Sequence, residues 1–300
     1  MCGDLVEVGF ERELVSVAPL RGGTRKGVHR LTFDDDSAAV LYTWDPAADY
    51  WPSHGEDPAS PFADGSGVDL FEAAHEELGA LGVRTPRVHV LDRSRTRYPA
   101  DFAVVDDVRG VRTDRTLPAL GEALRVMAAH EGAAFGKLRG GTPQDRSCEQ
   151  VVLDRALGHL TEAAVRVERV EAVRGELEHA LRALACAIEP RTRYGLVHGE
   201  LGPEHVLTDA DGQPVIIDIE GLMYFDVEWE HAFLKFRFGE DYPWLEVDGL
   251  DERRLDFYRL ALHLSLIEGP LRLLDGDFPH RAGMLEIVEA NIAHALGFLR

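Results

Sequence analysis

The sequence predicts an α+β protein in which a small antiparallel sheet precedes a larger, mainly helical part. Short alternating apolar runs separated by turn residues recur in residues 1–108, and such runs are typical of strands. Long segments rich in Ala, Leu, Arg and Glu dominate residues 109–300, and they are typical of helices. We therefore expect an N-terminal lobe built on a sheet and a C-terminal lobe built from helices, and a chain of 300 residues could bury them as one large core or as two modest domains.

Three strands and a glycine-rich loop are expected at the start of the chain. Alternating apolar residues predict strands over 13–18 and 28–33, and a turn of three aspartates leads to a third strand over 38–44. The loop between the first two strands contains Gly22 and Gly23. Such a unit can cover phosphate groups with its backbone N–H groups. Ordinary hairpins with glycine have the same pattern, so both interpretations stay open.

The rest of the N-terminal lobe is expected to hold a long loop, one helix and two strands. Residues 45–67 are rich in Pro, Gly, Ser and Asp, which is typical of a loop. Apolar residues at helical spacing predict a helix over 68–81, which Gly82 would end. Further strands are predicted over 87–91 and 101–110, and the second of them would lead into the C-terminal lobe.

The C-terminal lobe is expected to consist of helices on either side of one hairpin. Composition and spacing predict helices over 117–138, 149–160, 162–188, 227–238, 252–267 and 281–299. Pro270 and Pro279 would separate the last two helices. The hairpin lies between the third and fourth of these helices.

The composition is ordinary for a soluble globular protein, with 45% hydrophobic and 28% charged residues in a chain of 300. Uncharged apolar stretches are far shorter than the roughly 18 residues of a membrane span. The first residues lack the basic start and apolar run of a signal peptide, so we expect a cytoplasmic location. Cys2, Cys148 and Cys186 are isolated in sequence, which predicts free thiols. We expect Cys186 to be a core residue on its helix.

The chain is strongly acidic. It has 53 acidic and 32 basic residues, which gives a formal net charge of −21. This charge repels nucleic acid and anionic membranes and attracts cations, so we expect neither of those partners and favour a cationic small molecule. A solvated acidic surface would give the same composition, and the oligomeric state stays open.

The hairpin carries a concentration of acids and imidazoles. Apolar runs that end at Val197 and begin at Val206 predict strands, and a turn at Asp211-Gly212 leads to a third strand. The loop and the strand ends carry His198, Glu200, Glu204, His205, Asp218 and Glu220. Charged groups seldom lie beside buried strands unless they bind a metal, pair or transfer protons. A solvated surface hairpin is the alternative.

At these residues the sequence resembles the aminoglycoside phosphotransferase family, which comprises antibiotic and small-molecule kinases built like protein kinases. The family signature is His-Gly-Asp, four residues, Asn, and then a strand that ends in Ile-Asp-Trp-Glu or Ile-Asp-Trp-Asp. His198-Gly199-Glu200, His205 and Ile217-Asp218-Ile219-Glu220 have the same spacing. A second family element, Gly-Asp-Pro-x-x-Asp-Leu-Ala, aligns with residues 225–232, where the matching residues are Asp226, Ala232 and, as an acid, Glu230.

The resemblance implies a protein-kinase-like fold, with a nucleotide-binding lobe over 1–108 and a catalytic and substrate-binding lobe over 109–300. Phosphoryl transfer needs an acceptor for the hydroxyl proton and ligands for the metal ion on the triphosphate. By this resemblance Glu200 stands at the position of the catalytic Asp, and His205 and Asp218 stand at the metal-ligand positions. His198 would order the loop. The implied cofactors are ATP or GTP and Mg²⁺ or another divalent metal.

Two of these residues depart from the family pattern. Glu200 keeps the carboxylate but adds a methylene, which can displace the proton acceptor by roughly 1 Å. His205 replaces an oxygen ligand with nitrogen, which suits Mg²⁺ less well than softer divalent ions. The macrolide phosphotransferases are similar in having His at this position, so Glu200 is the more serious departure.

The lysine that the family carries on its third strand is missing here from residues 40–44. Lys26, in the glycine-rich loop, is the only one of the three lysines of the chain that is placed to reach a nucleotide. We expect Lys26, or Arg25 beside it, to supply this charge, and the alternative is that both are exposed loop cations. Glu72 is the best match to the helix acid that pairs with the strand lysine in the family.

The resemblance also implies which residues bind nucleotide and substrate. Residues 105–108 match the hinge whose backbone hydrogen-bonds the adenine edge, although an ordinary surface strand with its turn is possible. The expected nucleotide-binding residues are Gly22, Gly23, Thr24, Lys26, Glu72, Val105, Asp106, Asp107 and Val108. An acidic, aromatic segment at 239–248 could receive a cationic sugar or could simply be solvated. The substrate candidates are Glu220, which could instead support the site from behind, Asp226, Glu230, Tyr242 and Trp244.

We therefore expect a phosphotransferase that acts on a hydroxyl of a small molecule, such as an aminoglycoside, a macrolide or a related aminosugar metabolite. Roles in antibiotic resistance and in biosynthesis fit the sequence equally well. Two other classes stay open: a pseudokinase that binds nucleotide or a partner without transfer, and a metal-dependent hydrolase. The phosphotransferase rests on one geometric expectation, that Glu200, His205 and Asp218 converge on a cavity beneath the glycine-rich loop.

Overall fold

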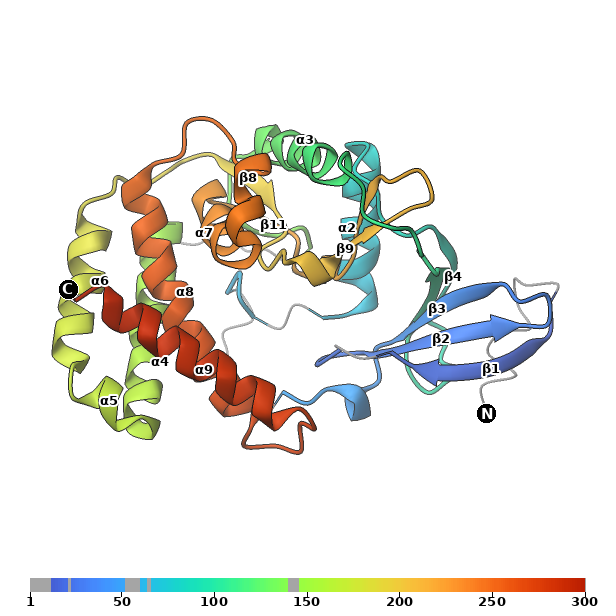
Figure 1. Ribbon diagram of the computed structural model, residues 1–300, viewed down its shortest axis with the longest axis horizontal. Helices are drawn as coiled ribbons and strands as arrows, with labels where there is room; N and C mark the ends of the chain where they lie inside the picture. The colour runs from blue at the N-terminus through green and yellow to red at the C-terminus, as the bar shows by residue number, and fades with distance from the viewer. Residues whose placement is uncertain (1–11, 21–22, 52–59, 64–65, 140–145, 300) are drawn as a thin grey trace. The chain divides into compact units, whose positions relative to one another are not determined.

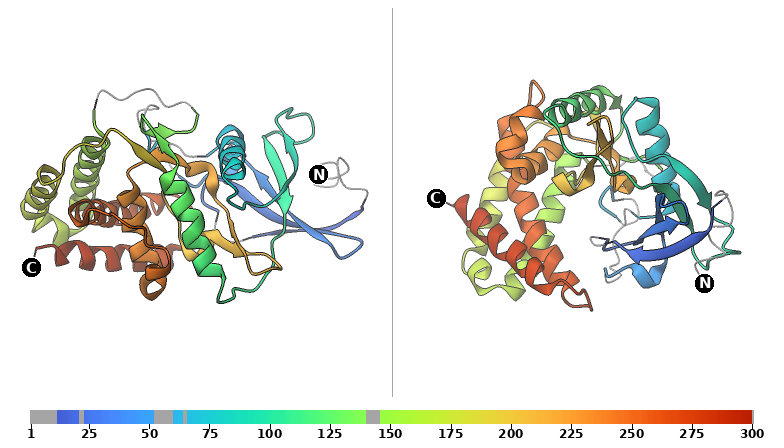
Figure 2. Two further views of the ribbon diagram at one scale, coloured as in Figure 1. Left: turned by 90° about the horizontal axis from the view of Figure 1, so that it is seen from above. Right: turned by 45° about the vertical axis from the view of Figure 1, so that its right-hand side comes forward.

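The structure is a computed structural model that describes residues 12–20, 23–51, 60–63, 66–139 and 146–299 (Figure 1, Figure 2). The chain forms two compact units. Unit 1 consists of Met1–Trp51, Asp64–Ala123 and Glu204–Gly221, and unit 2 consists of Pro52–Ala63, Leu124–Pro203 and Leu222–Arg300. Unit 1 is built on a sheet and unit 2 mainly from helices, so the predicted α+β class is confirmed.

Unit 1 is built on a five-stranded antiparallel sheet with the strand order β1-β2-β3-β5-β4. Its strands are β1 (Leu14–Pro19), β2 (Gly27–Phe33), β3 (Ala38–Thr43), β4 (Val88–Asp92) and β5 (Phe102–Asp106). Strands β1 to β3 lie side by side as the blue arrows of Figure 1. Leu31, Leu41 and Val104 bury their side chains in one core cluster of this sheet. The register of β2 on β3 places Gly27 opposite Thr43 and so fixes the residue before it, Lys26.

A helix and a hairpin complete unit 1. The remaining elements here are η1 (Pro46–Ala48), α2 (Val68–Ala80), η2 (Pro203–His205), which begins in unit 2, β9 (Val206–Thr208), β10 (Pro214–Ile216) and η3 (Ile219–Gly221). Helix α2 buries Phe71, Ala74 and Leu78. The helix ends before Gly82, whose positive φ of 74° suits glycine, as the sequence predicts.

The hairpin of β9 and β10 is tied to unit 1 by backbone hydrogen bonds. Gly110 N–H donates to Thr208 O over 2.6 Å, and Ile216 N–H donates to Arg84 O over 2.9 Å. A Cβ atom at Gly110 would lie 2.0 Å from the carbonyl oxygen of the residue after β9, so this close approach requires glycine. Unit 1 therefore includes residues 204–221, which the sequence boundary near residue 108 assigns to the other lobe.

Unit 2 combines a four-stranded sheet, in the order β6-β8-β11-β7, with a set of helices. The strands are β6 (Glu131–Gly132), β7 (Gly136–Lys137), β8 (Tyr194–Val197) and β11 (Met223–Phe225). The helices are α3 (Thr116–Ala129), which begins in unit 1, α4 (Cys148–Arg166), α5 (Glu168–Glu171), α6 (Arg174–Cys186), α7 (Val227–Phe238), η4 (Gly239–Trp244), α8 (Glu252–Leu273) and α9 (Arg281–Gly297). Helix α8 packs against α4, α7 and α9 (Figure 1). Phe225, Trp229 and Tyr258 lie edge to face in the core between these helices and the sheet.

The helix predicted over 117–138 ends at Ala129, because the chain after it enters the sheet of unit 2. Glu131 lies opposite Gly195 of β8, and Lys137 lies opposite Met223 of β11. Lys137 is therefore on a strand and not on the predicted helix. The very short strands β6 and β7 have no periodicity that a sequence pattern could reveal.

Two other predictions of the helical part are wrong in detail. The break predicted at residue 161 lies at Val167, where φ is −130° and ψ is 103°. Helix α8 continues through Pro270, which lies in its last turn, because Ile267 and Leu273 on either side stay packed in the core. Among the described residues no helix is long and apolar enough to cross a membrane.

The described cysteines are free thiols, as predicted. Cys148 is buried at the start of α4, whereas Cys186 is exposed at the end of α6 and is not the core residue that we expected. The buried residues of α6 are Leu177 and Leu181, so the core-facing stripe of this helix does not include Cys186. Cys2 lies outside the described residues.

Candidate functional site

Unit 1 brings together Lys26, Asp218 and Glu220, although almost 200 residues separate the lysine from the two acids. Lys26 Nζ lies 2.8 Å from Asp218 Oδ1 and also donates a hydrogen bond to Glu220 Oε1. The exposed fractions of the side chains are 9% for Lys26 and 4% for Glu220, but 46% for Asp218. The cluster is thus a buried ion pair with one carboxylate that remains open to solvent.

The sheet of unit 1 determines where Lys26 lies. A Cβ atom at Gly27 would lie 2.4 Å from Thr43 Oγ1, so glycine lets β2 approach the end of β3 closely. The ammonium group of Lys26 then lies 5.0 Å from the centre of the Tyr42 ring. Burial alone would lower the pKa of Lys26, but attraction by Glu220 and Asp218 outweighs it and holds the pKa above the ordinary value. Lys26 is therefore permanently charged at neutral pH.

Asp218 faces two different partners through its two oxygens. It follows β10 with a φ of 61°, in the left-handed region that Asp tolerates better than most residues. Its Oδ2 atom lies 3.5 Å from His205 Nε2. A backbone hydrogen bond from Ile217 N–H to His205 O, over 3.0 Å, holds the two segments together. The two residues predicted to bind metal are therefore neighbours in unit 1.

The donor set of His205 and Asp218 fits a divalent metal ion. Two atoms that both lie about 2.1 Å from one ion are separated by roughly 3.0 to 3.5 Å, which the separation of 3.5 Å between Nε2 and Oδ2 matches. One carboxylate oxygen, together with waters and phosphate oxygens, is a usual set for Mg²⁺, whereas an imidazole nitrogen favours a softer ion such as Mn²⁺. The pair would therefore suit either ion and would favour the softer one.

The predicted nucleotide-binding residues of the loop lie around Lys26. Thr24 O accepts a hydrogen bond from Tyr50 N–H, and Thr24 Oγ1 accepts one from Trp51 Nε1 over 3.0 Å. A Cβ atom at Gly23 would lie 2.6 Å from Lys26 O, so the loop folds tightly back on itself. Gly22 lies outside the described residues. Tyr50 and Trp51 thus both hold Thr24, in the described part of the loop.

The structure places the expected hinge residues at and beyond the end of β5, and the expected helix acid, Glu72, beside an arginine. Val105 and Asp106 belong to β5, and Asp106 N–H donates to Arg87 O. Asp107 accepts two hydrogen bonds from Arg30, and with Val108 it lies beyond the end of β5. Glu72, on α2, accepts a hydrogen bond from Arg93 over 2.7 Å, so the acid expected to pair with a phosphate-binding lysine pairs with an arginine.

Unit 2 holds Glu200 and His198 on the loop after β8. His198 is buried and Glu200 is exposed. Gly199, between them, has a φ of 90°, and its N–H donates to Glu230 Oε2 of α7 over 2.6 Å. Burial raises the pKa of Glu230 to about 7, although the backbone N–H groups of Gly199, His198 and Leu201 oppose this effect. Glu230 therefore anchors the loop that carries Glu200.

Most of the predicted substrate residues are buried in the structure. The exposed fraction is 4% for Glu220, 0% for Asp226, 3% for Glu230 and 5% for Tyr242. Tyr242 O–H lies 3.2 Å from His231 Nδ1 in the interior of unit 2. Trp244 of η4, by contrast, is 57% exposed. Of these five residues, Trp244 alone presents a large surface to solvent.

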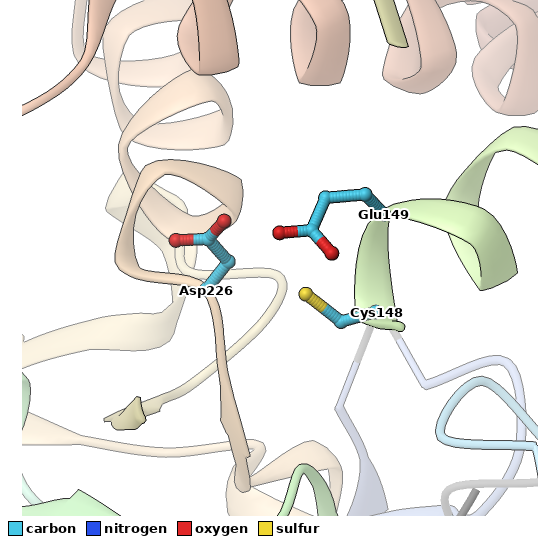
Figure 3. Close-up of side chains that lie close together, drawn as sticks. All are labelled: Cys148, Glu149 and Asp226. Atoms are coloured by element: carbon cyan, nitrogen blue, oxygen red, sulfur yellow. The ribbon is translucent and has the colours of Figure 1, made fainter. Parts of the chain in front are cut away.

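A second cluster of unit 2 has the residue types of a metal site (Figure 3), and arginines bind its carboxylates. Ligand atoms of Cys148, Glu149 and Asp226 lie within 4.8 Å of one another, and the two carboxylates point toward the same space. Arg254 Nη1 donates to both carboxylates, over 2.7 Å to Glu149 Oε1. Tyr258 O–H and Arg191 also donate to Asp226. We interpret this cluster as a structural link between α4, α7 and α8, which gives Asp226 a role in packing and not in substrate binding.

Sequence reasoning placed Lys26 near the nucleotide but missed its partners. Glu220 is the second acid of the Ile-Asp-Ile-Glu segment, and its spacing of two residues from Asp218 was the available signal. Trp44 Nε1 donates to Glu220 Oε1 over 3.3 Å, a contact that no local pattern could reveal. The arginines that satisfy Asp226 were likewise not identifiable, because they lie 28 and 35 residues away in sequence.

Comparisons with known proteins show the family and the fold of this chain. The family described as "Phosphotransferase enzyme family", APH, matches residues 66–264. A thermostable mutant of the aminoglycoside phosphotransferase APH(4)-Ia superposes with a TM-score of 0.63 at 18% identity, over 95% of this chain and 96% of that chain. Spectinomycin phosphotransferase APH(9)-Ia gives 0.64 at 12% identity (99% and 97%), and the choline kinase LicA from Streptococcus pneumoniae gives 0.62 at 14% (99% and 95%). No protein of curated function matches the chain in sequence. The chain therefore belongs to the APH phosphotransferase enzyme family.

Proposed function

We propose that this protein transfers the γ-phosphoryl group of ATP or GTP to a hydroxyl group of a cationic small molecule. The observation that carries the proposal is the cluster in unit 1, in which the buried Lys26 and the imidazole of His205 both lie beside the exposed carboxylate of Asp218. Binding of a metal-bound triphosphate needs a cation for the phosphate oxygens and two ligands for the metal ion. Membership of the phosphotransferase family supports the same reaction.

In this proposal Asp218 and His205 hold the divalent ion, which neutralises charge on the triphosphate when it is bound. Lys26 adds a second positive charge toward the phosphate oxygens. Asp107 and Val108, beyond the end of β5, offer backbone groups to the adenine edge, because the sheet already uses the N–H group of Asp106. Together these residues bind the nucleotide and orient its terminal phosphate.

Glu200 is proposed as the proton acceptor. The substrate hydroxyl oxygen forms a bond to the γ-phosphorus, the bond from that phosphorus to the bridging oxygen breaks, and the hydroxyl proton passes to the Glu200 carboxylate. ADP or GDP leaves with the bridging oxygen. The anchoring of the loop by Glu230 would compensate for the extra methylene of Glu200 by restricting where the carboxylate can lie.

We propose a cationic acceptor because the chain carries a net charge of −21. Two of the similar structures were determined with hygromycin B or with spectinomycin bound, and a third is a choline kinase. Trp244 is exposed on η4, between the acidic residues Asp241 and Glu246. An aromatic face beside carboxylates suits an ammonium group.

The experiment is transfer of radiolabelled phosphate from ATP and GTP to a panel of aminoglycosides, macrolides and choline-like alcohols. We expect transfer to at least one cationic acceptor, with a loss of more than 100-fold in Glu200→Ala. Glu162→Gln, at an exposed position of α4, is the matched control and should retain full activity. Nucleotide binding without transfer to any acceptor would instead indicate a pseudokinase, and the absence of nucleotide binding would refute both kinase functions.

A further inference from the structure

We infer that Glu220 is a positioning residue that holds Lys26 in place for the triphosphate. In this arrangement Lys26 and Glu220 replace the pair of strand lysine and helix acid that the family resemblance implies. The inference rests on the proposed function, and all the residues that carry it lie in unit 1.

The ammonium group of Lys26 is held by several contacts at once. Asp218 Oδ1 accepts a hydrogen bond from Nζ over 2.8 Å, Glu220 Oε1 accepts another, and the Tyr42 ring lies 5.0 Å away. A lysine side chain that is free in solution would populate many rotamers. These contacts remove that freedom, so the positive charge is fixed before any nucleotide arrives.

Glu220 is more deeply buried than Asp218, and its charge is directed at Lys26. Trp44 Nε1 donates to Glu220 Oε1 over 3.3 Å, and Glu220 Oε2 is buried with no hydrogen-bond partner among the described residues. An ionised carboxylate in such surroundings is costly unless a cation faces it. Lys26 is the cation that faces Glu220.

Helix α2 does not provide the acid for this pair. Glu72 of α2 accepts its hydrogen bond from Arg93. Glu220 lies on η3, which packs against α2, two residues after Asp218. The acid that positions the lysine and the acid proposed to bind the metal are thus on one short segment. The Lys26 charge that binds the phosphates therefore keeps a fixed distance from Asp218, the proposed metal ligand.

The test is the affinity for ATP, measured by calorimetry in the absence and presence of Mn²⁺. Simple electrostatics predicts that Glu220→Gln binds the anionic nucleotide more tightly, because one negative charge is lost. Positioning of Lys26 predicts the opposite, a loss of about 10-fold in affinity, which is typical for a hydrogen bond to a charged group. Glu76→Gln, at an exposed position of α2, is the matched control and should bind ATP as the wild type does.

The double variant Lys26→Met/Glu220→Gln separates a positioning role from a direct one. If Glu220 acts through Lys26, the double variant binds ATP no more weakly than Lys26→Met alone. Equal or tighter binding by Glu220→Gln, or additive losses in the double variant, would overturn the inference. A wild-type protein that binds no ATP would refute the proposed function itself, so the two failures are distinguishable.

A milder variant keeps the test valid if Glu220→Gln does not fold, which circular dichroism would reveal. Trp44→Phe removes only the N–H donor to Glu220 and keeps an aromatic ring beside Phe71. We expect about a threefold loss of ATP affinity in this variant, because a neutral donor contributes less than a charged one. Unchanged affinity in Trp44→Phe, with Glu220→Gln unfolded, would also overturn the inference.

Discussion

Replacement of Glu230 by Gln should remove a specific component of the pH dependence of stability. Burial raises the pKa of Glu230 from its ordinary value of 4.5 to about 7 in the folded protein. Between these two values the folded state binds a proton that the unfolded state has lost. The contribution of Glu230 is therefore most favourable below pH 4.5, falls as the pH rises to 7, and is constant above that.

The size of this component follows from the same values. Each pH unit in the interval is worth about 1.36 kcal/mol, so between pH 5 and pH 8 the Glu230 contribution falls by roughly 2 to 3 kcal/mol. Gln keeps an oxygen that can accept the hydrogen bond from Gly199 N–H, but it cannot ionise. The free energy of unfolding of Glu230→Gln, relative to the wild type, should therefore rise by this amount from pH 5 to pH 8.

Urea denaturation at four pH values between 5 and 8 measures this difference. Burial lowers the pKa of His231 and His263 to about 4, which makes stability fall as the pH drops from 6.5 to 4. That opposite trend is shared by both proteins and cancels in the comparison. Glu178→Gln, on the exposed face of α6, should show the wild-type pH dependence. Parallel curves for the wild type and Glu230→Gln would refute the reasoning.

Three further predictions concern other parts of the chain. Arg254→Met leaves Asp226 with one fewer cation in the interior. The free energy of unfolding, measured by urea denaturation, should therefore fall by about 3 to 5 kcal/mol. A loss below about 1 kcal/mol would contradict the structural role of Arg254. Removal of divalent ions with a chelator should abolish transfer, and Mn²⁺ should restore it better than Mg²⁺. His205→Asn should shift this preference toward Mg²⁺ in the labelled-phosphate assay. An unchanged ratio of the activities with Mn²⁺ and Mg²⁺ would exclude the imidazole as a ligand. Gly110→Ala should lower the free energy of unfolding by about 1 to 3 kcal/mol, because the new Cβ atom would lie 2.0 Å from a backbone oxygen. Gly283→Ala in α9 places its Cβ atom in open space and should leave the free energy of unfolding equal or higher in the same denaturation experiment.

The elements of unit 1 follow closely from local sequence. The predicted strands at 13–18, 28–33 and 38–44 correspond to β1, β2 and β3, because alternation and turn residues determine such hairpins locally. The end of α2 at Gly82 follows from one glycine. The prediction that Lys26 is placed near the nucleotide came from exclusion of the other two lysines, and the structure puts Lys26 beside Asp218 and Glu220.

What the sequence could not predict depends on contacts between distant segments. The pairing of Lys26 with Glu220 rather than with an acid of α2 depends on where the hairpin of β9 and β10 docks. The backbone hydrogen bonds from Gly110 N–H to Thr208 O and from Ile216 N–H to Arg84 O decide that. The burial of Asp226 depends on Arg254, which a family motif does not contain. The helix predicted over 117–138 ends early because its continuation pairs with strands that come much later in the chain.

The most direct test of the proposed metal and nucleotide site is anomalous diffraction from crystals grown with Mn²⁺ and a non-hydrolysable ATP analogue. We predict an anomalous peak for Mn²⁺ between Asp218 Oδ2 and His205 Nε2, with the Lys26 ammonium group at the phosphate oxygens of the analogue. Bound nucleotide with Mn²⁺ at other residues, and with Lys26 out of contact with the phosphates, would contradict the proposal.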